Sequence, residues 1–498
     1  MPSPFDTETL RLLSPELVLT SFALVVLTLD FLFPRTRGLL PWISLAGLAA
    51  TVLATLAIWP AADGADVEAT AILSGMMAVD PFALFFKVIA ALTTALVILS
   101  SLDFMAPRTQ YQGEFYGLLL LATLSMTLLA AANDLIMIFL ALEFLSLTSY
   151  VLTGYLRDDY LSIEGGLKYL LYGAVTTAVA LYGMSLLYGI TGETNLVAIA
   201  QAITGATAEP ITADRTLILP ALVFILAGFG FKISLVPFHQ WTPDAYEGAP
   251  TPIAAFLSVG PKAVGFAILI RVLFIGFPAY EIDWVAILSG VALVTMTFGN
   301  VVAIQQQNIK RLLAYSSISQ VGYILLGVVS LGPDSIGQAG VLIYLLAYLF
   351  TNLGAFVAVV AFSHITRSDN IADYAGLVRR SPLLAMALVV FFMSLAGIPP
   401  TGGFLGKLFV FGAAVQAGFY ALAIAAVLNS VVSLYYYFAI VRRMFFVPPR
   451  DASSLPLSSS LAFTVWATLL LTLAIGIYPQ PVIDLANRSV SLLAASSL

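Results

Sequence analysis

The feature that most constrains this chain is a succession of long apolar stretches that follow one another almost from end to end. A helix needs about 20 mostly apolar residues to cross the hydrocarbon core of a membrane. We therefore expect an all-α polytopic membrane protein, with short surface helices in the longest connections, 191–216 and 364–382. The sequence predicts about fourteen spans, near residues 15–34, 39–60, 77–100, 114–131, 134–155, 162–190, 217–238, 250–274, 284–303, 311–331, 336–363, 383–415, 420–441 and 459–478.

The composition excludes several classes of function. Hydrophobic residues make up 60% of the 498 residues and charged residues only 10%, whereas soluble domains contain roughly 25% charged residues. The absence of cysteine excludes disulfides, iron–sulfur ligation and cysteine nucleophiles. A net charge of −6 leaves no basic patch for nucleic acid. No metal-binding, phosphate-binding or dinucleotide motif occurs in a suitable context, so we expect no cofactor or metal in this chain.

Lysine and arginine are unevenly distributed over the connections between the spans. Cytoplasmic connections of membrane proteins carry an excess of these residues. Thirteen of the 21 cations follow odd-numbered spans, and Arg11, Arg215, Arg271 and Arg488 lie on the opposite side. This distribution predicts that both termini lie outside the cytoplasm. The remaining four cations are lysines within predicted spans, namely Lys87, Lys232, Lys262 and Lys407.

Four consecutive spans of the first half recur in the second half at spacings of 171 to 175 residues. Because each unit contains five spans, the second unit enters the membrane from the opposite side, which predicts an inverted repeat. Residues that recur include Ser146 and Ser319, Tyr169 and Tyr344, Lys232 and Lys407, and Ala254 and Ala425. The expected organisation is a three-helix segment (1–110), a first five-helix unit (111–280), a second, inverted five-helix unit (281–445) and a C-terminal helix and tail (446–498).

Two predicted spans, the seventh and the twelfth, contain helix-breaking residues beside a lysine. Lys232 precedes Pro237, and Lys407 follows a Pro- and Gly-rich segment, 399–403. A lysine at the bilayer centre costs roughly 2.5–3.5 kcal/mol on insertion scales, so it needs a reason to be there. Interrupted helices at corresponding places in two inverted halves indicate a transport site. A structural hinge without ion transport is the alternative interpretation.

Glu143 is the one acidic residue near the middle of the fourth to eighth spans. We expect it to pair with Lys232 or with another lysine of the same unit. Pairing favours the charged ammonium, whereas burial disfavours it, so separation of the pair favours release of a proton. The alternative is a static ion pair that joins two helices.

Three further residues are candidates for proton transfer. Lys262 follows Gly260 and Pro261 and is placed to relay protons between Lys232 and Lys407. His239 follows the break of the seventh span, where it is either a point of proton entry or a structural residue. For Lys87, snorkelling of the ammonium to the headgroup layer is as good an explanation as a functional role.

Three stretches resemble a known family. They are LEFLSLTSYVLTGY, PFHQWTPDAYEGAPTPIAAFLSVGPKAVGF and IPPTGGFLGKL, and the resemblance covers nearly the whole chain. They are similar to the N-type antiporter-like membrane subunits of bacterial respiratory complex I, the proton-pumping NADH:quinone oxidoreductase. Lys407 stands where M-type subunits carry glutamate, and Lys262 stands where related subunits often carry histidine.

The resemblance implies a fourteen-helix fold with two inverted five-helix units, broken helices 7 and 12, and residence in the bacterial inner membrane with periplasmic termini. It implies that Glu143 modulates Lys232, that Lys262 connects the halves and that Lys407 passes the proton toward the periplasm. Flavin, iron–sulfur clusters and quinone are expected in partner subunits only. The implied partners are the M-type subunit, small membrane subunits, the lateral helix of the L-type subunit, and lipids.

Two other functions remain open from the sequence. One is a subunit of a multisubunit Na⁺/H⁺ antiporter, because such subunits are relatives of the same family. The other is a membrane scaffold that does not transport ions, because Glu143 and Lys262 correspond to Ser316 and Ser433 in the second repeat.

Overall fold

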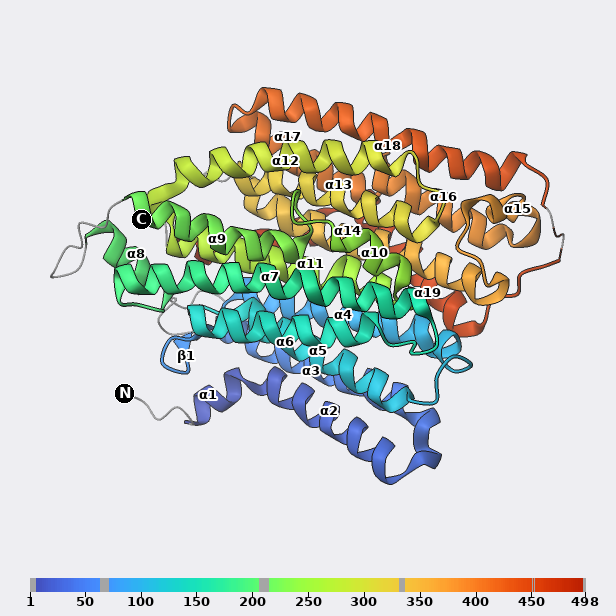
Figure 1. Cartoon of the computed structure of the whole chain (residues 1–498), viewed down its shortest axis with the longest axis horizontal. Helices are drawn as coiled ribbons and strands as arrows, with labels where there is room; N and C mark the ends of the chain where they lie inside the picture. Colours follow the sequence, from blue (N-terminus) through green and yellow to red (C-terminus); the bar gives the residue numbers. More distant parts are fainter. Residues whose placement is uncertain are drawn as a thin grey trace.

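In the computed structural model, long helices run side by side along one direction (Figure 1). The structure describes residues 6–62, 71–205, 215–330, 336–449, 451 and 453–495. Thirteen helices of these described residues are long and apolar enough to cross a membrane. The paired helices α16 (Pro382–Ala396) and α17 (Gly402–Gln416) occupy the predicted twelfth span. The prediction of an all-α membrane protein is therefore confirmed.

The first half of the chain contains the following elements. They are α1 (Thr7–Leu12), α2 (Ser14–Leu32), η1 (Pro34–Leu39), α3 (Leu40–Ala62), β1 (Ala71–Ile72), β2 (Met77–Ala78), α4 (Pro81–Met105), α5 (Gln112–Ala131), α6 (Leu135–Thr153), α7 (Tyr160–Thr191), α8 (Leu196–Thr204), α9 (Arg215–Ile233), α10 (Trp241–Gly248) and α11 (Thr251–Arg271). The strands β1 and β2 pair antiparallel.

The remaining elements follow η2 (Val272–Gly276), a π-helical turn that extends α11. They are η3 (Pro278–Tyr280), α12 (Glu281–Ala303), α13 (Ile309–Val329), α14 (Gly337–Thr366), η4 (Ile371–Tyr374), α15 (Leu377–Arg380), α16, α17, α18 (Tyr420–Phe446), α19 (Ser459–Ile477) and α20 (Gln480–Ala495). The expected surface helices are present as α8 and α15. The helix α20 lies where the sequence predicted only a tail.

Polar caps define where several of the long helices begin. The side chains of Asp80, Asp134, Asp159 and Asn308 accept hydrogen bonds from the first-turn amides of α4, α6, α7 and α13. Such side chains satisfy amides that have no partner within the helix. The ends predicted from hydropathy alone therefore lie within a few residues of the observed ones.

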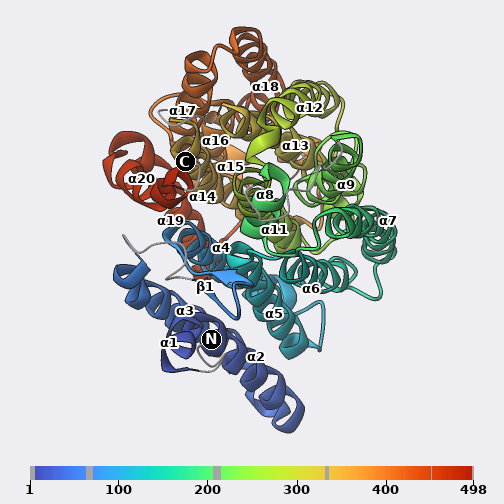
Figure 2. The same cartoon turned by 90° about the vertical axis from the view of Figure 1, so that its left-hand side faces the viewer.

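The centre of the bundle is formed by α11 and α14, with α4 beside them (Figure 2). Every residue of α11 is buried. The helices α2 and α3 lie at one edge and α18 lies at the opposite edge (Figures 1 and 2). The charged candidate residues of α11 are therefore enclosed by other helices and have no route to lipid.

The two ends of the bundle differ in their elements. The helices α1 and α8 and the strand β1 lie at one end, and α15 lies at the other (Figure 1). Arg271, counted above as a topology signal, is buried and pairs with Asp80 at 2.9 Å. It is therefore a packing residue and gives no information on orientation. Arg450 and the side chain of Arg215 lie outside the described residues.

Candidate functional site

The three lysines next to predicted helix breaks are all buried in the bundle. Lys232 and Lys262 are 1% exposed and Lys407 is 4% exposed. Within the described part of the chain, no carboxylate oxygen lies within 4 Å of any of these three ammonium groups. Each ammonium is instead held by hydroxyl or carbonyl oxygens. A buried cation of this kind has little solvation to lose on giving up its proton.

Lys232 lies in the last turn of α9, next to the break before α10. Its Nζ donates to Ser146 Oγ of α6 at 3.2 Å and to the Tyr169 hydroxyl of α7 at 3.5 Å. Ser146 Oγ donates in turn to its own helix at Leu142 O. Lys232 is therefore held loosely, by two neutral groups from two helices of the first unit.

Glu143 does not form the ion pair that the sequence predicted. It lies on α6 one turn before Ser146 and is partly buried, and its Oε1 has no hydrogen-bond partner among the described residues. Ser146, rather than Glu143, occupies the position in contact with Lys232. Because Glu143 and Ser146 lie one turn apart on the same side of α6, the carboxylate is offset along the helix from the residue that contacts Lys232.

Lys262 lies in the middle of α11 and contacts α13, in the second half of the chain. Its Nζ donates to Ser317 Oγ of α13 at 2.7 Å. The Tyr348 hydroxyl of α14 donates to the same Ser317 oxygen at 2.8 Å. One turn earlier on α11, Ser258 accepts from Asn352 of α14 at 2.7 Å. The polar face of α11 therefore meets polar groups of α13 and α14.

Lys407 has the closest set of contacts of the three lysines. Its Nζ donates to Leu395 O at 2.9 Å, to Ala396 O at 3.0 Å and to Ser430 Oγ at 3.0 Å. Leu395 and Ala396 end α16, so the ammonium caps carbonyls that have no partner within the helix. The negative end of the helix dipole also favours a cation there.

A glutamine links the Lys262 region to the Lys407 region. Gln320 lies one turn after Ser317 on α13, and its Nε2 donates to Leu395 O at 3.0 Å. The Tyr344 hydroxyl of α14 donates to Gln320 Oε1. Because Leu395 O also accepts from Lys407, polar groups follow one another from Lys262 to Lys407 along one side of α13.

The two helix breaks have the same backbone geometry. In the first, the amides of Ser234 and Leu235 bond to Phe231 O and Gly230 O; in the second, those of Gly397 and Ile398 bond to Ser394 O and Met393 O. Ser234 has φ +69° and Gly397 has φ +87°. The breaks therefore match at a spacing of 163 residues (234 to 397, 230 to 393).

This spacing changes the correspondence of the lysines. Lys232 lies before its break, on α9, and Lys407 lies after its break, on α17. At the observed spacing, Lys232 corresponds to Leu395 and Lys407 corresponds to Asp244. The predicted equivalence of Lys232 and Lys407, drawn from a shared Gly-Phe-x-x-Lys pattern, was therefore wrong, although both helices break as predicted.

Lys87 is separate from this arrangement. It lies on α4, is 0% exposed, and its Nζ is 2.8 Å from Glu16 Oε1 of α2. Snorkelling to the headgroups is therefore wrong for Lys87. The pair joins the N-terminal helices to the bundle, and removal of one partner would leave a buried uncompensated charge.

His239 lies in the segment between α9 and α10 and is 8% exposed. Its ring packs edge-on against Phe298 of α12, with 4.6 Å between ring centroids. Its Nδ1 has no partner among the described residues. The structure brings His239 into hydrogen-bond contact with none of the three lysines.

Charged side chains surround the short helix α10 at the end of the bundle where α7 and α13 begin. Asp244 of α10 is 2.8 Å from Lys168 Nζ and 2.6 Å from Arg311 Nη1, which is also 2.8 Å from Glu247. Partial burial opposes ionisation of Asp244, but the hydrogen bonds from Lys168 and Arg311 outweigh it and hold the pKa of that carboxyl below its usual value. Asp244 is therefore ionised at neutral pH.

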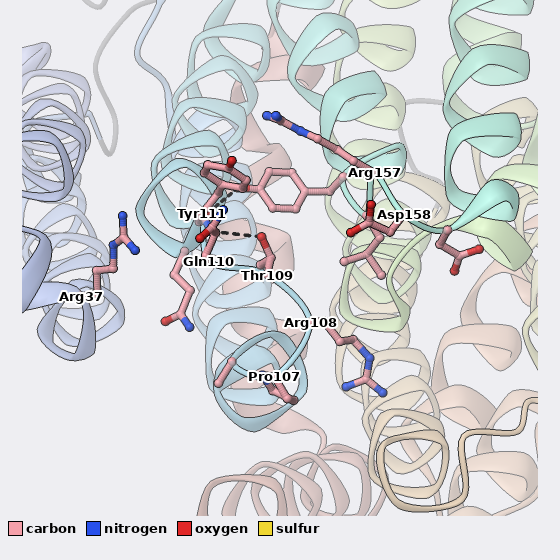
Figure 3. Close-up of a pocket in the computed structure, with 13 residues that line it drawn as sticks. Arg37, Pro107, Arg108, Thr109, Gln110, Tyr111, Arg157 and Asp158 are labelled. Atoms are coloured by element: carbon pink, nitrogen blue, oxygen red, sulfur yellow. Dashed lines mark hydrogen bonds between the residues drawn. The ribbon is translucent and has the colours of Figure 1, made fainter.

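A separate surface pocket of about 860 Å³ lies where three connections meet (Figure 3). Arg37, Arg108 and Arg157 line it, one from each connection. All three belong to the cation-rich set of connections, so these connections do gather at one end of the bundle. None of the predicted site residues lines this pocket, and Asp158 and Asp159 offset part of its positive charge.

Sequence reasoning missed the residues that hold the lysines. They are Tyr169, Trp241, Tyr246, Ser317, Gln320, Tyr344, Tyr348 and Ser430. A glutamine in the middle of an apolar span and two tyrosines four residues apart on α14 were visible signals, because polar groups in spans need partners. In the described ranges, no cluster of three or more histidine, aspartate or glutamate residues is arranged to hold a metal ion.

Comparison with known proteins places this geometry in context. Residues 132–433 match a family model described as "NADH:quinone oxidoreductase/Mrp antiporter, TM". The chain is 42% identical to NADH-quinone oxidoreductase subunit N of Trichlorobacter lovleyi over 98% of both chains. It is 43% identical to NAD(P)H-quinone oxidoreductase subunit 2 of a Synechocystis species over 96% of this chain and 92% of the relative.

Solved structures show the same fold. A chain of respiratory complex I from Thermus thermophilus with bound aureothin matches with a TM-score of 0.78 and 32% identity, over 94% of this chain and 98% of that chain. A chain of the Mrp complex from a Dietzia species matches with a TM-score of 0.85 and 23% identity, over 98% of both chains. At that identity, the second likeness shows the fold alone.

Proposed function

This chain belongs to the family of membrane subunits shared by NADH:quinone oxidoreductases and Mrp antiporters, and on that premise we propose how it moves protons. It is a proton-translocating membrane subunit of an NADH:quinone oxidoreductase, a complex of several subunits. We propose that protons pass through Lys232, Lys262 and Lys407, with Glu143 biasing Lys232. His239 and Lys87 lie outside this path.

The observation that carries the proposal is that three buried ammonium groups have no carboxylate partner within 4 Å among the described residues, and that polar side chains link the surroundings of two of them, Lys262 and Lys407. Lys262 reaches Ser317, and Gln320 on the same helix shares Leu395 O with Lys407. A lysine that is stabilised by neutral groups alone exchanges its proton more readily than one fixed in an ion pair. Static ion pairs of the kind that Lys87 and Glu16 form would be a poor route for protons.

The remaining parts of the proposal concern the assembly. Protons move from the cytoplasm to the periplasm, and both termini face the periplasm of a bacterial inner membrane. The subunit carries no redox centre, and flavin, iron–sulfur clusters and quinone bind to other subunits. Its neighbours are the M-type subunit, small membrane subunits, the lateral helix of the L-type subunit, and lipids. Relatives above 40% identity are oxidoreductase subunits, so a role in a Na⁺/H⁺ antiporter is the weaker alternative.

The test uses the complete complex in sealed membrane vesicles. Lys232→Ala and Glu143→Ala are compared with Arg11→Gln, whose parent side chain forms a half-exposed surface pair with Glu8. We expect proton translocation linked to quinone reduction to fall strongly in Lys232→Ala, to fall in Glu143→Ala and to be unchanged in Arg11→Gln. Normal rates and normal proton stoichiometry in both site variants would contradict the proposal.

A further inference from the structure

The short helix α10 lies between the two units and touches both. It packs on α7 with almost no side chain between the backbones, because a Cβ atom on Gly248 would lie 2.1 Å from Leu161 O and one on Gly165 would lie 3.0 Å from Asp244 O. It also faces the beginning of α13, through Arg311. A helix of eight residues is too short to be stable by itself. Its position is therefore set by its contacts.

One side of α10 is fixed by charged groups. Asp244 accepts from Lys168 of α7 and from Arg311 of α13, and Glu247 accepts from the same Arg311 Nη1 and from Asn308. The four charged side chains are each between a quarter and two-fifths exposed. Asn308, the fifth residue of the group, caps α13. Arg311 therefore ties both carboxylates of α10 to the second unit, while Lys168 ties one of them to the first.

The other side of α10 presents aromatic rings to the proposed proton path. Trp241 stacks on Tyr169, with 4.0 Å between ring centroids and 7° between planes. Tyr169 is the residue whose hydroxyl contacts Lys232. Tyr246 packs edge-on against Trp241 at 6.2 Å, and Lys262 Nζ lies 5.5 Å from the Tyr246 ring centre. The two rings of α10 therefore stand between the surroundings of Lys232 and those of Lys262.

We propose that Asp244 and Glu247, through Lys168 and Arg311, position α10 and thereby set the aromatic wall of Trp241 and Tyr246 between Lys232 and Lys262. The four charged groups are positioning residues, since none of them touches a lysine of the path. With the ion pairs intact, the wall closes the space between the two lysines and limits the water that joins them. Displacement of α10 opens that space or misplaces the aromatic wall. This inference rests on the proposed function.

The space between the two lysines matters because protons travel along hydrogen-bonded groups and water. The carbon atoms of an aromatic ring offer no such hydrogen bonds and leave no room for water. The Trp241 Nε1–H is already engaged with Phe231 O at 2.9 Å. The hydroxyl of Tyr246 has no partner among the described residues. A change in the position of α10 therefore changes both the barrier and the position of the Tyr246 ring, whose centre lies 5.5 Å from Lys262 Nζ.

The experiment measures protons translocated per NADH oxidised by the assembled complex in sealed vesicles. Arg311→Gln removes the shared cation, and Arg311→Lys retains the charge but lacks the planar guanidinium whose Nη1 bonds both carboxylates. We expect about a fivefold loss of translocation per NADH in Arg311→Gln and a smaller loss in Arg311→Lys. Arg11→Gln is the matched control and should behave as the unmodified complex.

A double-variant comparison separates positioning from general damage. If the ion pairs act through the wall, Arg311→Gln should add almost nothing to the loss already caused by Trp241→Phe. If Arg311→Gln does not assemble, the same comparison is made with Arg311→Lys. Additive losses, or unchanged translocation per NADH in both Arg311 variants, would overturn the inference. Lys232→Ala is measured in parallel: unchanged translocation in Lys232→Ala contradicts the proposed function itself, whereas a loss there with normal Arg311 variants contradicts the positioning role alone.

Discussion

The two broken helices of this chain have the same backbone turn but place their lysines on opposite sides of it. In the first half, Lys232 ends α9 and contacts the hydroxyls of Ser146 and Tyr169. In the second half, Lys407 lies on α17 and reaches back to the carbonyls of Leu395 and Ala396 at the end of α16. In the first break the neutral indole of Trp241 donates to Phe231 O, which corresponds to Ser394 O at the spacing of 163 residues.

This difference shows that the two halves share the helix break but not the surroundings of the lysine next to it. In both halves a Schellman-type turn ends one helix and bonds two of its carbonyls, so that the last carbonyls of the helix have no backbone partner in it. Those carbonyls stabilise an ammonium only in the second half, where the helix dipole adds to the effect. Lys232 lacks this support, and in the proposed path it is Glu143 that biases its charge. We therefore expect the function of Lys407 to be sensitive to the geometry of the helix end at α16. The function of Lys232 should be sensitive to nearby charge instead.

The largest expected effect comes from replacing each lysine by an isosteric apolar residue. Lys232→Met and Lys407→Met should each lower proton translocation by at least about tenfold, because each removes a proton carrier. Only Lys407→Met should also lower the amount of assembled complex, because it leaves Ala396 O without a donor at a cost of about 1–3 kcal/mol, while Leu395 O keeps the bond from Gln320. Translocation and yield from the same membranes test this, and equal yields for the two variants would break the comparison.

A smaller effect is expected from the residues with positive φ in the two turns. Gly397→Ala places a Cβ 2.7 Å from Lys407 Cδ at φ +87°. Strain of about 1–3 kcal/mol and a displaced lysine should lower translocation several-fold. Ser234→Gly relieves the backbone strain in the first turn and loses only the bond from Thr242, so its effect should be slight. The thermal midpoint of the assembled complex, together with translocation, distinguishes the two; equal losses would count against separate roles.

An intermediate test concerns the polar groups that the lysines share. Gln320→Leu removes the group that joins Tyr344 to Leu395 O, and we expect translocation to fall about threefold while Lys407 remains held by its other contacts. Asn429→Leu is a comparison on α18 that breaks bonds to Asn300 and Thr297 outside this route. If both variants slow translocation equally, Gln320 has no special place in the path.

The smallest effect is expected for single hydroxyls beside the lysines. Ser430→Ala removes one of three contacts of Lys407, whereas Ser146→Ala removes one of two contacts of Lys232. A hydrogen bond to a charged group contributes about 1.5–3 kcal/mol. We expect Ser146→Ala to slow translocation more than Ser430→Ala, measured as the initial rate in vesicles. The reverse order would show that the contacts of Lys407 are the weaker set.

Much of the fold was accessible from the sequence because hydropathy and helix breakers act locally. All fourteen predicted spans correspond to helices, and the breaks near Pro237 and Pro399 lie where the proline and glycine residues placed them. The contacts were less accessible, because hydropathy does not give the rotation of a helix about its axis. Hydropathy also does not give the position of a helix along its axis, and on α6 it is this position that decides whether Glu143 or Ser146, one turn apart on the same side, meets Lys232.

The candidate lysines themselves were predictable because a buried cation stands out in an apolar span. Their partners were not, since Ser317, Tyr348 and Ser430 are ordinary residues of membrane helices until the packing brings them together. The equivalence of Lys232 and Lys407 failed for a related reason. A short pattern of Gly, Phe and Lys matches in sequence at a spacing of 175 residues, whereas the backbone of the two turns matches at 163 residues, a difference of twelve.

The buried pair of Lys87 and Glu16 has a consequence for how the chain enters the bilayer during synthesis. Glu16 lies on α2 and Lys87 on α4, and a whole helix, α3, is made between them. Released alone, each helix would carry a bare charge into lipid at a cost of roughly 2.5–3.5 kcal/mol. In the least costly order, α2 stays beside the insertion machinery until α4 emerges. The three helices then enter the lipid together, with the charges of Glu16 and Lys87 paired.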